Sequence, residues 1–207
     1  PVVIKNITLT GVQRGIKMNN SAVNLALTGC TINASLRGID SPSLMYSGVS
    51  LILDNTTINC SDVSDYDTQV KYDQSCRGIS LWNIKNSQVT LQNNSSINGF
   101  SYCINVSGDP SESGVSDTAG LKVDVVDSTL RGWTGFNIWG SSAVYTIKGS
   151  TVKGVNTSSA TSNSFAAIVF NDDIYDQFAQ AHAVNNTLSI ADSTITNFQG
   201  GSCTENL

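Results

Sequence analysis

Short runs of alternating hydrophobic and polar residues recur from one end of the chain to the other. Two of them contain Val23, Leu25 and Leu27, and Val49, Leu51 and Leu53. A period of two is typical of a β-strand that buries one face and exposes the other. The pattern therefore predicts an all-β protein.

A four-residue signature follows most of these runs: a turn residue, then usually two small hydroxyl residues, then an aliphatic residue. Its seven copies begin at Asn6, Gly29, Asn55, Asn94, Asp127, Gly149 and Asp192. Asn, Asp and Gly tolerate a positive φ angle, so the chain can turn sharply at each of these positions. We expect the aliphatic residue that closes each signature to open a second strand.

A third apolar segment lies about seven residues beyond the signature aliphatic. Its central residues are Ile16, Ile39, Ile79, Ile104, Phe136 and Ile168. The pattern thus predicts three short strands in each repeat. The repeat between Leu91 and Ile97 has one extra residue, which predicts a β-bulge.

Repetition of one supersecondary unit along a chain indicates a solenoid, in which each unit buries its apolar face against its neighbours. The repeats resemble the right-handed parallel β-helix of the pectate-lyase-like superfamily. This resemblance implies about seven three-stranded coils with loop insertions, forming a single domain over residues 1–207. We interpret the chain as a piece of a longer protein.

Composition narrows the possible partners. The formal net charge is −5, with an isoelectric point near 4.6, which argues against nucleic-acid binding because that function needs a basic face. No apolar run approaches the roughly 18 residues of a membrane-spanning helix, so we predict no membrane insertion of this segment. The sequence indicates no cofactor.

Cys60 and Cys76 bracket the insertion Ser61–Ser75. We predict a disulfide that staples this loop, and such a bond implies an oxidising, secreted or cell-surface location. Cys30 and Cys103 occupy repeat positions that other units fill with small residues. We expect both to be small buried thiols.

Enzymes of the fold that this chain resembles cleave polysaccharides with clustered carboxylates along one sheet. On the outward rows of the third segments, Asp40 is the one carboxylate, so we assign no catalytic residue. Asp62, Asp65, Asp67 and Asp73 lie together in the loop after Cys60. We interpret them as solvated, with a calcium site as the alternative, because calcium favours oxygen-rich loops.

Aromatic, amide and charged side chains follow the same predicted face. The candidate ligand-binding residues are Trp82, Tyr102, Trp133 and Trp139, the amides Asn105 and Asn137, and Arg37, Arg77 and Asp40. Aromatic rings beside amides suit sugar stacking with hydrogen bonds, and arginines at one repeat position suit an anionic sugar.

These features favour a non-catalytic surface adhesin that recognises a host-surface glycan or an extracellular matrix protein. The low charge and long polar repeats resemble passenger segments of bacterial autotransporter adhesins. One alternative is a polysaccharide lyase or glycoside hydrolase, with carboxylates brought together from Asp40, the acidic loop and Asp109–Asp117. A third hypothesis is a structural stalk or phage tail-fibre segment.

Overall fold

The computed structural model describes residues 1–19, 23–41, 46–82, 84–107, 118–155, 164–171 and 183–199. These residues form strands and turns and contain no helix. Most of the strands belong to two large parallel sheets. The prediction of an all-β chain is confirmed.

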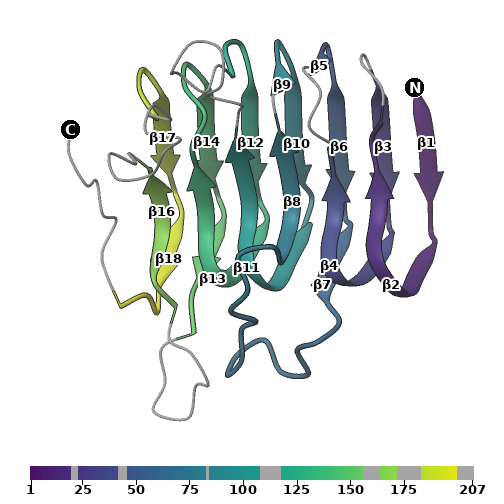
Figure 1. Cartoon of the computed structure of the whole chain (residues 1–207). Helices are drawn as coiled ribbons and strands as arrows, with labels where there is room; N and C mark the ends of the chain where they lie inside the picture. The colour runs from purple at the N-terminus through teal and green to yellow at the C-terminus, as the bar shows by residue number, and fades with distance from the viewer. Residues whose placement is uncertain are drawn as a thin grey trace.

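Sheet A has seven strands, and their spatial order follows the sequence. They are β1 (Val2–Lys5), β3 (Asn24–Thr28), β6 (Ser50–Asp54), β10 (Gln88–Gln92), β12 (Lys122–Val126), β14 (Val144–Lys148) and β17 (Thr187–Ala191). Figure 1 shows them side by side, with β1 and β17 at opposite ends of the row.

Sheet B also follows the sequence in its order. Its main path is β2 (Thr8–Lys17), β4 (Thr31–Asp40), β7 (Thr57–Cys60), β11 (Ser96–Ser107), β13 (Thr129–Ile138), β15 (Thr151–Lys153) and β18 (Thr194–Thr196). Beside this path, β8 (Arg77–Trp82) pairs with β4 and β11, and β16 (Ala166–Phe170) pairs with β13. A small third sheet joins β5 (Tyr46–Ser47) to β9 (Ile84–Lys85).

The chain passes from sheet A to sheet B and back, and we call each such passage a round. Every round adds its strands next to those of the preceding round. In β2, β4, β11 and β13 the predicted second and third strands form one continuous strand. The second and third strands are separate where an insertion interrupts the round, namely between β7 and β8 and between β15 and β16. The register shifts between the two segments, from Leu9 to Arg14 of β2 and from Asn98 to Phe100 of β11, where Gly11 and Gly99 have positive φ angles. Pairing resumes beyond each shift.

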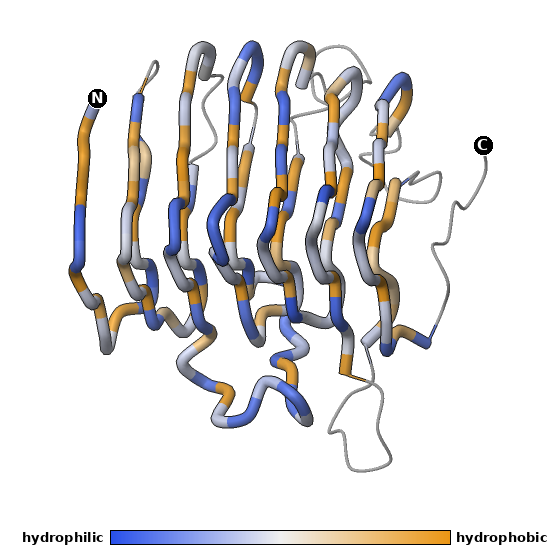
Figure 2. Tube along the Cα trace, turned by 180° about the vertical axis from the view of Figure 1, so that it is seen from behind, coloured by the Kyte–Doolittle hydropathy of each residue, from blue (hydrophilic) through white to orange (hydrophobic). Residues whose placement is uncertain are grey.

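The interior is built from columns of like residues. In sheet A, Leu25, Leu51, Val89, Val123 and Tyr145 occupy one register position. In sheet B, Ile39, Ile79, Ile104, Phe136 and Ile168 occupy another. All ten are buried, and Figure 2 shows hydrophobic residues alternating with hydrophilic ones along the strands. The predicted inward positions are therefore confirmed for these columns.

The first residue of each signature has a positive φ angle, as predicted. The values run from 45° at Asp127 to 64° at Asn94. In the longer repeat, Asn93 and Asn94 are both in this region, with φ of 54° and 64°. The extra residue thus lies in the turn between β10 and β11, and the predicted strand bulge is wrong at this position. The turn absorbs the residue because Asn is among the side chains that tolerate this conformation.

Hydroxyl groups at the second signature position connect the rounds. Backbone N–H groups of Cys30, Thr56, Ser128 and Ser150 donate to hydroxyl groups of Thr56, Ser95, Ser150 and Ser193, respectively. The hydroxyl groups of Thr56, Ser95 and Ser150 donate in turn to backbone carbonyls of a neighbouring round. The hydroxyl residue of the signature therefore satisfies backbone groups at a turn that is buried inside the stack.

Tyr145 is the largest fully buried side chain, and its ring meets Phe136 and Phe170 edge-on at centroid distances of 6.1 and 6.2 Å. Its hydroxyl group has no hydrogen-bond partner among the described residues, and burial raises its pKa. We expect Tyr145→Phe to raise the free energy of unfolding by about 1–3 kcal/mol, since it removes an unpaired buried polar group and keeps the ring. Urea unfolding followed by circular dichroism measures this. A Phe variant less stable than the parent would show that the hydroxyl group is paired.

Candidate functional site

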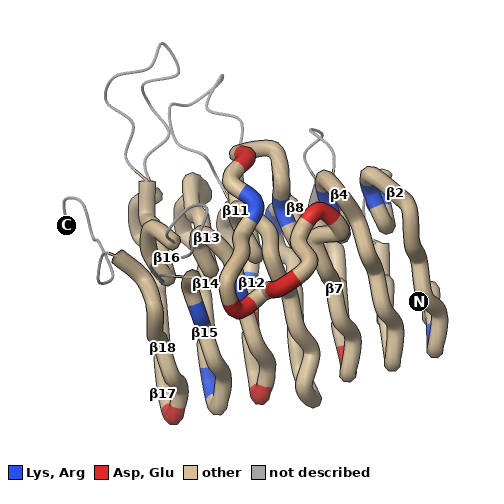
Figure 3. The backbone as a smooth tube through the Cα atoms, turned by 90° about the horizontal axis from the view of Figure 1, so that it is seen from below, with Lys and Arg blue, Asp and Glu red and all other residues tan. Residues whose placement is uncertain are grey.

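Three arginines lie side by side on the face of sheet B. Arg14 of β2 pairs in register with Arg37 of β4, which pairs with Arg77 of β8. Three residues further along the same strands, Lys17, Asp40 and Ser80 form a second row. Figure 3 shows basic segments on β2, β4 and β8. The repeat thus converts one sequence position into a row of cations across neighbouring strands.

Asp40, the central residue of the second row, forms ion pairs with arginines of the first. Only 2% of its surface is exposed. Arg37 Nη1 donates to Asp40 Oδ1 at 2.7 Å, and Arg14 Nε lies 3.3 Å from Asp40 Oδ2. A buried carboxylate needs such partners, because an unpaired charge away from water is strongly unfavourable. Asp40 therefore contacts two of the three arginines, Arg14 and Arg37.

A cavity of about 310 Å³ opens beside this carboxylate. Its lining residues are Arg14, Lys17, Arg37, Asp40, Ser41, Ser80 and Trp82. Two of these side chains have a buried N–H group without a partner among the described residues, namely Arg37 Nε and Trp82 Nε1. The cavity thus has three cations for one carboxylate, and two N–H groups without such partners. It can bind an anionic group through the cations and neighbouring hydroxyl oxygens through the N–H groups.

Arg77 connects this cavity to the next part of the face. Its Nε donates to the Gln74 carbonyl at 3.1 Å, and its strand neighbour on the far side is Tyr102 of β11. Burial lowers the pKa of the Arg77 guanidinium, and repulsion by Arg37 lowers it further. Burial likewise raises the pKa of Tyr102.

An aromatic cluster lies beyond Tyr102. Trp133 stacks on Phe165 at 5.2 Å between ring centroids, with 18° between the planes. Tyr72 meets Trp133 edge-on at 4.9 Å, and Tyr102 lies 6.2 Å from it. Tyr72 is 57% exposed and Phe165 39% exposed, so the cluster presents aromatic surface to solvent.

Sequence reasoning missed Tyr72 and Phe165. Phe165 had a signal, because it precedes Ile168 by the same three residues that separate Trp133 from Phe136. Tyr72 had none, since it lies in an insertion outside the repeat.

The two other predicted tryptophans share a register position. Trp82 pairs with Ser107 of β11, and the Trp139 N–H donates to the carbonyl of Val106, the residue before Ser107. Two strand separations place their backbones about 10 Å apart. Both side chains are half-buried.

Asn105 and Asn137 are engaged with each other, and both are buried. Asn137 Nδ2 donates to Asn105 Oδ1 at 2.7 Å, and Asn171 Nδ2 donates to Asn137 Oδ1 at 2.9 Å. A second ladder joins Asn98, Asn59 and Asn33 in the same way. Stacking in register brings each amide donor to the acceptor of the preceding round, so these amides hold rounds together.

The four loop carboxylates have separate partners. Asp62 pairs with Lys71, Asp67 with Lys153 at 2.8 Å, and Asp73 accepts from the N–H and hydroxyl groups of Ser75. Asp65 accepts from the Asp67 N–H and the Thr68 hydroxyl. In the part of the chain that the structure describes, no group of three or more His, Cys, Asp or Glu side chains is arranged to hold a metal ion.

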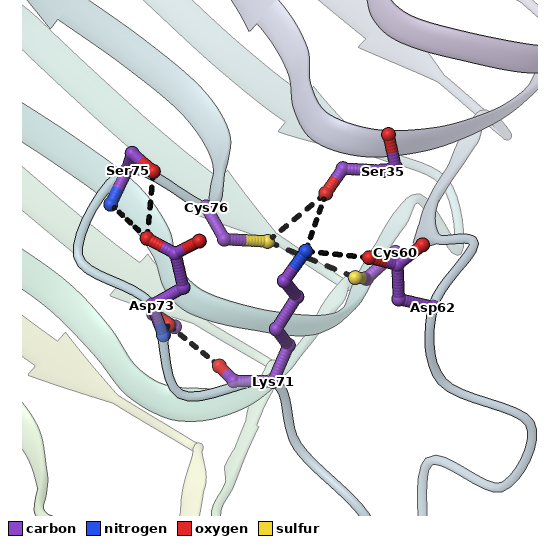
Figure 4. A network of polar contacts seen from close by, with 8 residues as sticks. Ser35, Cys60, Asp62, Lys71, Asp73, Ser75 and Cys76 are labelled. Carbon is purple, nitrogen blue, oxygen red and sulfur yellow. Dashed lines mark hydrogen bonds and ion pairs between the residues drawn. The ribbon is translucent and has the colours of Figure 1, made fainter.

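Cys60 and Cys76 lie side by side as thiols, with their Sγ atoms 3.7 Å apart and both side chains buried (Figure 4). The sequence-based expectation that they form a disulfide stays a prediction. Cys30 and Cys103 are also buried free thiols, as expected.

Asp109–Asp117, which the enzymatic alternative would use, lie outside the described residues. Across the described ranges no helix is long and apolar enough to cross a membrane. The chain matches no protein-family model, no curated protein and no solved structure. The site itself must therefore carry any argument about function.

Proposed function

We propose that the chain is a right-handed parallel β-helix of about seven rounds that acts as a non-catalytic binding segment. Its ligand is an anionic glycan of a host surface or of the extracellular matrix, bound on the face of sheet B. The parent protein would then be a secreted or cell-surface adhesin. The observation that carries this proposal is the cavity beside Asp40, which Arg14, Lys17 and Arg37 line together with Trp82, and where two buried N–H groups have no partner among the described residues.

The donor set supports an acidic sugar over a neutral one. Arginine presents a planar fork of N–H groups that matches a carboxylate or sulfate. Arg37 already uses Nη1 for Asp40 and leaves Nε without a partner. Trp82 offers a ring for stacking and an N–H group for a hydroxyl oxygen. Sugar sites combine these two kinds of contact in the same way.

The carboxylates support binding over cleavage. Hydrolysis of a glycosidic bond ordinarily uses two carboxyl groups on either side of that bond. Among the residues that line the cavity, Asp40 is the single carboxylate, and two arginines hold it. Such a group is suited to fixing the arginine side chains that contact a ligand.

A glycan-array screen of the folded chain tests the proposal, with released reducing ends and unsaturated products assayed for every ligand. We expect acidic glycans to be retained without product, and more weakly as salt concentration rises. Product formation would support the lyase or hydrolase alternative. No binding to any glycan or matrix protein would favour the structural stalk.

Trp82→Ala and Trp139→Ala are each expected to weaken binding about tenfold, because a stacked ring contributes about 1–1.5 kcal/mol. Titration calorimetry with the best glycan of the screen measures the affinity, and far-ultraviolet dichroism checks the fold. Ile52→Ala is the matched control, since Ile52 is an exposed apolar side chain on sheet A. Unchanged affinity in both tryptophan variants would remove these rings from the site.

A further inference from the structure

The Cys60–Cys76 pair lies at the base of a loop that crosses sheet B. Cys60 ends β7, Cys76 immediately precedes β8, and residues 61–75 connect them. The two thiols are already in van der Waals contact at 3.7 Å. Because a disulfide needs about 2.05 Å between the sulfur atoms, bond formation requires only a small further approach of two side chains.

The loop rests on β11 through main-chain and hydroxyl contacts. The Lys71 N–H donates to the Gly99 carbonyl at 3.0 Å, and the Ser101 hydroxyl donates to the Lys71 carbonyl at 2.5 Å. At Gly99 any side chain would collide with the Tyr66 ring, since a Cβ atom there would lie 2.8 Å from it. Lifting the loop therefore breaks several contacts at once.

The groups around Cys60 and Cys76 favour ionisation of one thiol to a thiolate. Lys71 Nζ and Cys76 Sγ both contact the Ser35 carbonyl, at 3.1 and 3.7 Å (Figure 4). This places an ammonium group beside the sulfur pair. The pKa of Cys60 is lowered chiefly because Cys76 donates a hydrogen bond to it, whereas burial opposes ionisation. A cation beside a thiol favours the reactive thiolate.

We propose that Cys60 and Cys76 form a reversible thiol–disulfide pair that locks the 61–75 loop, and with it the Tyr72 ring, onto sheet B. The oxidant is a small disulfide such as oxidised glutathione. The Cys60 thiolate attacks one of its sulfur atoms, which forms a mixed disulfide on Cys60 and releases the other half of the oxidant as a thiolate. Cys76, after losing its proton, attacks Cys60 Sγ and releases the second thiolate.

In this exchange two protein thiols and one small disulfide give one protein disulfide and two small thiols. Two electrons pass from the cysteine pair to the oxidant. Because both sulfur atoms are buried, the first attack requires the loop to open locally. Once the bond has formed, the base of the loop can no longer separate, and Tyr72 stays against Trp133.

The test uses the full chain with Cys203→Ser, so that the remaining thiols are Cys30, Cys60, Cys76 and Cys103. The protein is equilibrated in glutathione buffers of increasing oxidation, quenched with N-ethylmaleimide under denaturing conditions and mapped by mass spectrometry. We expect Cys60 and Cys76 to lose labelling together, whereas Cys30 and Cys103 remain labelled. Full labelling of Cys60 and Cys76 in the most oxidising buffer would overturn the proposal.

Limited trypsin digestion tests the lock itself, since Lys71 lies inside the loop. We expect cleavage after Lys71 to be at least fivefold slower in the oxidised form, with fragments that stay joined on a non-reducing gel. Equal cleavage of both forms would overturn the lock even if the bond forms.

Cys76→Ser should behave as the reduced form in every buffer. The matched control Cys30→Ser should oxidise and resist trypsin like the parent, because Cys30 occupies the hydroxyl column of the turns. Neither readout uses a glycan, so failure of the lock and failure of glycan binding are separate results.

Discussion

Replacing Leu51 by aspartate is expected to abolish the folded state. Leu51 is fully buried on β6, where its column joins Leu25 on one side and Val89 on the other. A fully buried leucine contributes about 1.5–3 kcal/mol, and an unpaired carboxylate in its place adds a larger desolvation cost. Together these costs are comparable with the roughly 5–15 kcal/mol by which a folded domain is normally stable.

Thermal unfolding followed by circular dichroism measures the effect, and we expect no cooperative transition for Leu51→Asp. Ile52→Asp is the matched control, since the adjacent side chain is 37% exposed on the opposite face of the strand. It should unfold within a few degrees of the parent. A normal transition for Leu51→Asp would show that stacked apolar columns are not what stabilises the chain.

Removing the Arg37 side chain is the second large effect that we expect. Arg37→Ala deletes the 2.7 Å contact to Asp40, whose side chain is only 3% exposed. Breaking a buried ion pair by deleting one partner costs about 3–5 kcal/mol. Because Arg14 still contacts Asp40, we expect about 3 kcal/mol, or a melting temperature lower by roughly 6–12 °C.

Differential scanning calorimetry measures this change, and Arg131→Ala supplies the control on the same sheet. Arg131 lies 4.0 Å from Asp67, and both side chains are more than one-third exposed. That pair should contribute less than about 1 kcal/mol. Equal destabilisation by the two variants would mean that Asp40 is not held as the geometry indicates.

Arg37→Lys separates the structural role of Arg37 from its role in binding. Lysine keeps a positive charge near Asp40 and lacks the Nε donor of Arg37, which has no partner among the described residues. We expect it to retain most of the stability and to lose affinity for the acidic glycan. The same affinity as the parent would show that charge alone, and not the guanidinium fork, recognises the ligand.

The strands and turns could be predicted from the sequence because their causes are local. Alternation identified Leu25, Leu51 and Leu53 as buried, and the residue types at Asn55 and Asp127 predicted turns with positive φ. Such features depend on side-chain size and backbone sterics within a few residues. Repetition then indicated that each unit stacks on the next.

The candidate site could be predicted only in part. Arg37 and Arg77 were found because they occupy equivalent repeat positions, Asp40 because it is the carboxylate on the outward rows of the third segments, and Trp133 because it lies near the third segment. The buried amide ladder of Asn105 and Asn137 was not expected, since their hydrogen bonds depend on register between rounds.

The sequence by itself determined the all-β class, the repeating turns and the apolar columns, because each follows from a period and a residue type. Only the tertiary structure decided which neighbours share a contact. It gave Asp40 two arginine partners, placed Tyr72 against Trp133 and set Cys60 beside Cys76. Apart from Arg37–Asp40, which is local to β4, those contacts join residues from different rounds or residues of an insertion and its ends, and their positions depend on the path of the whole chain.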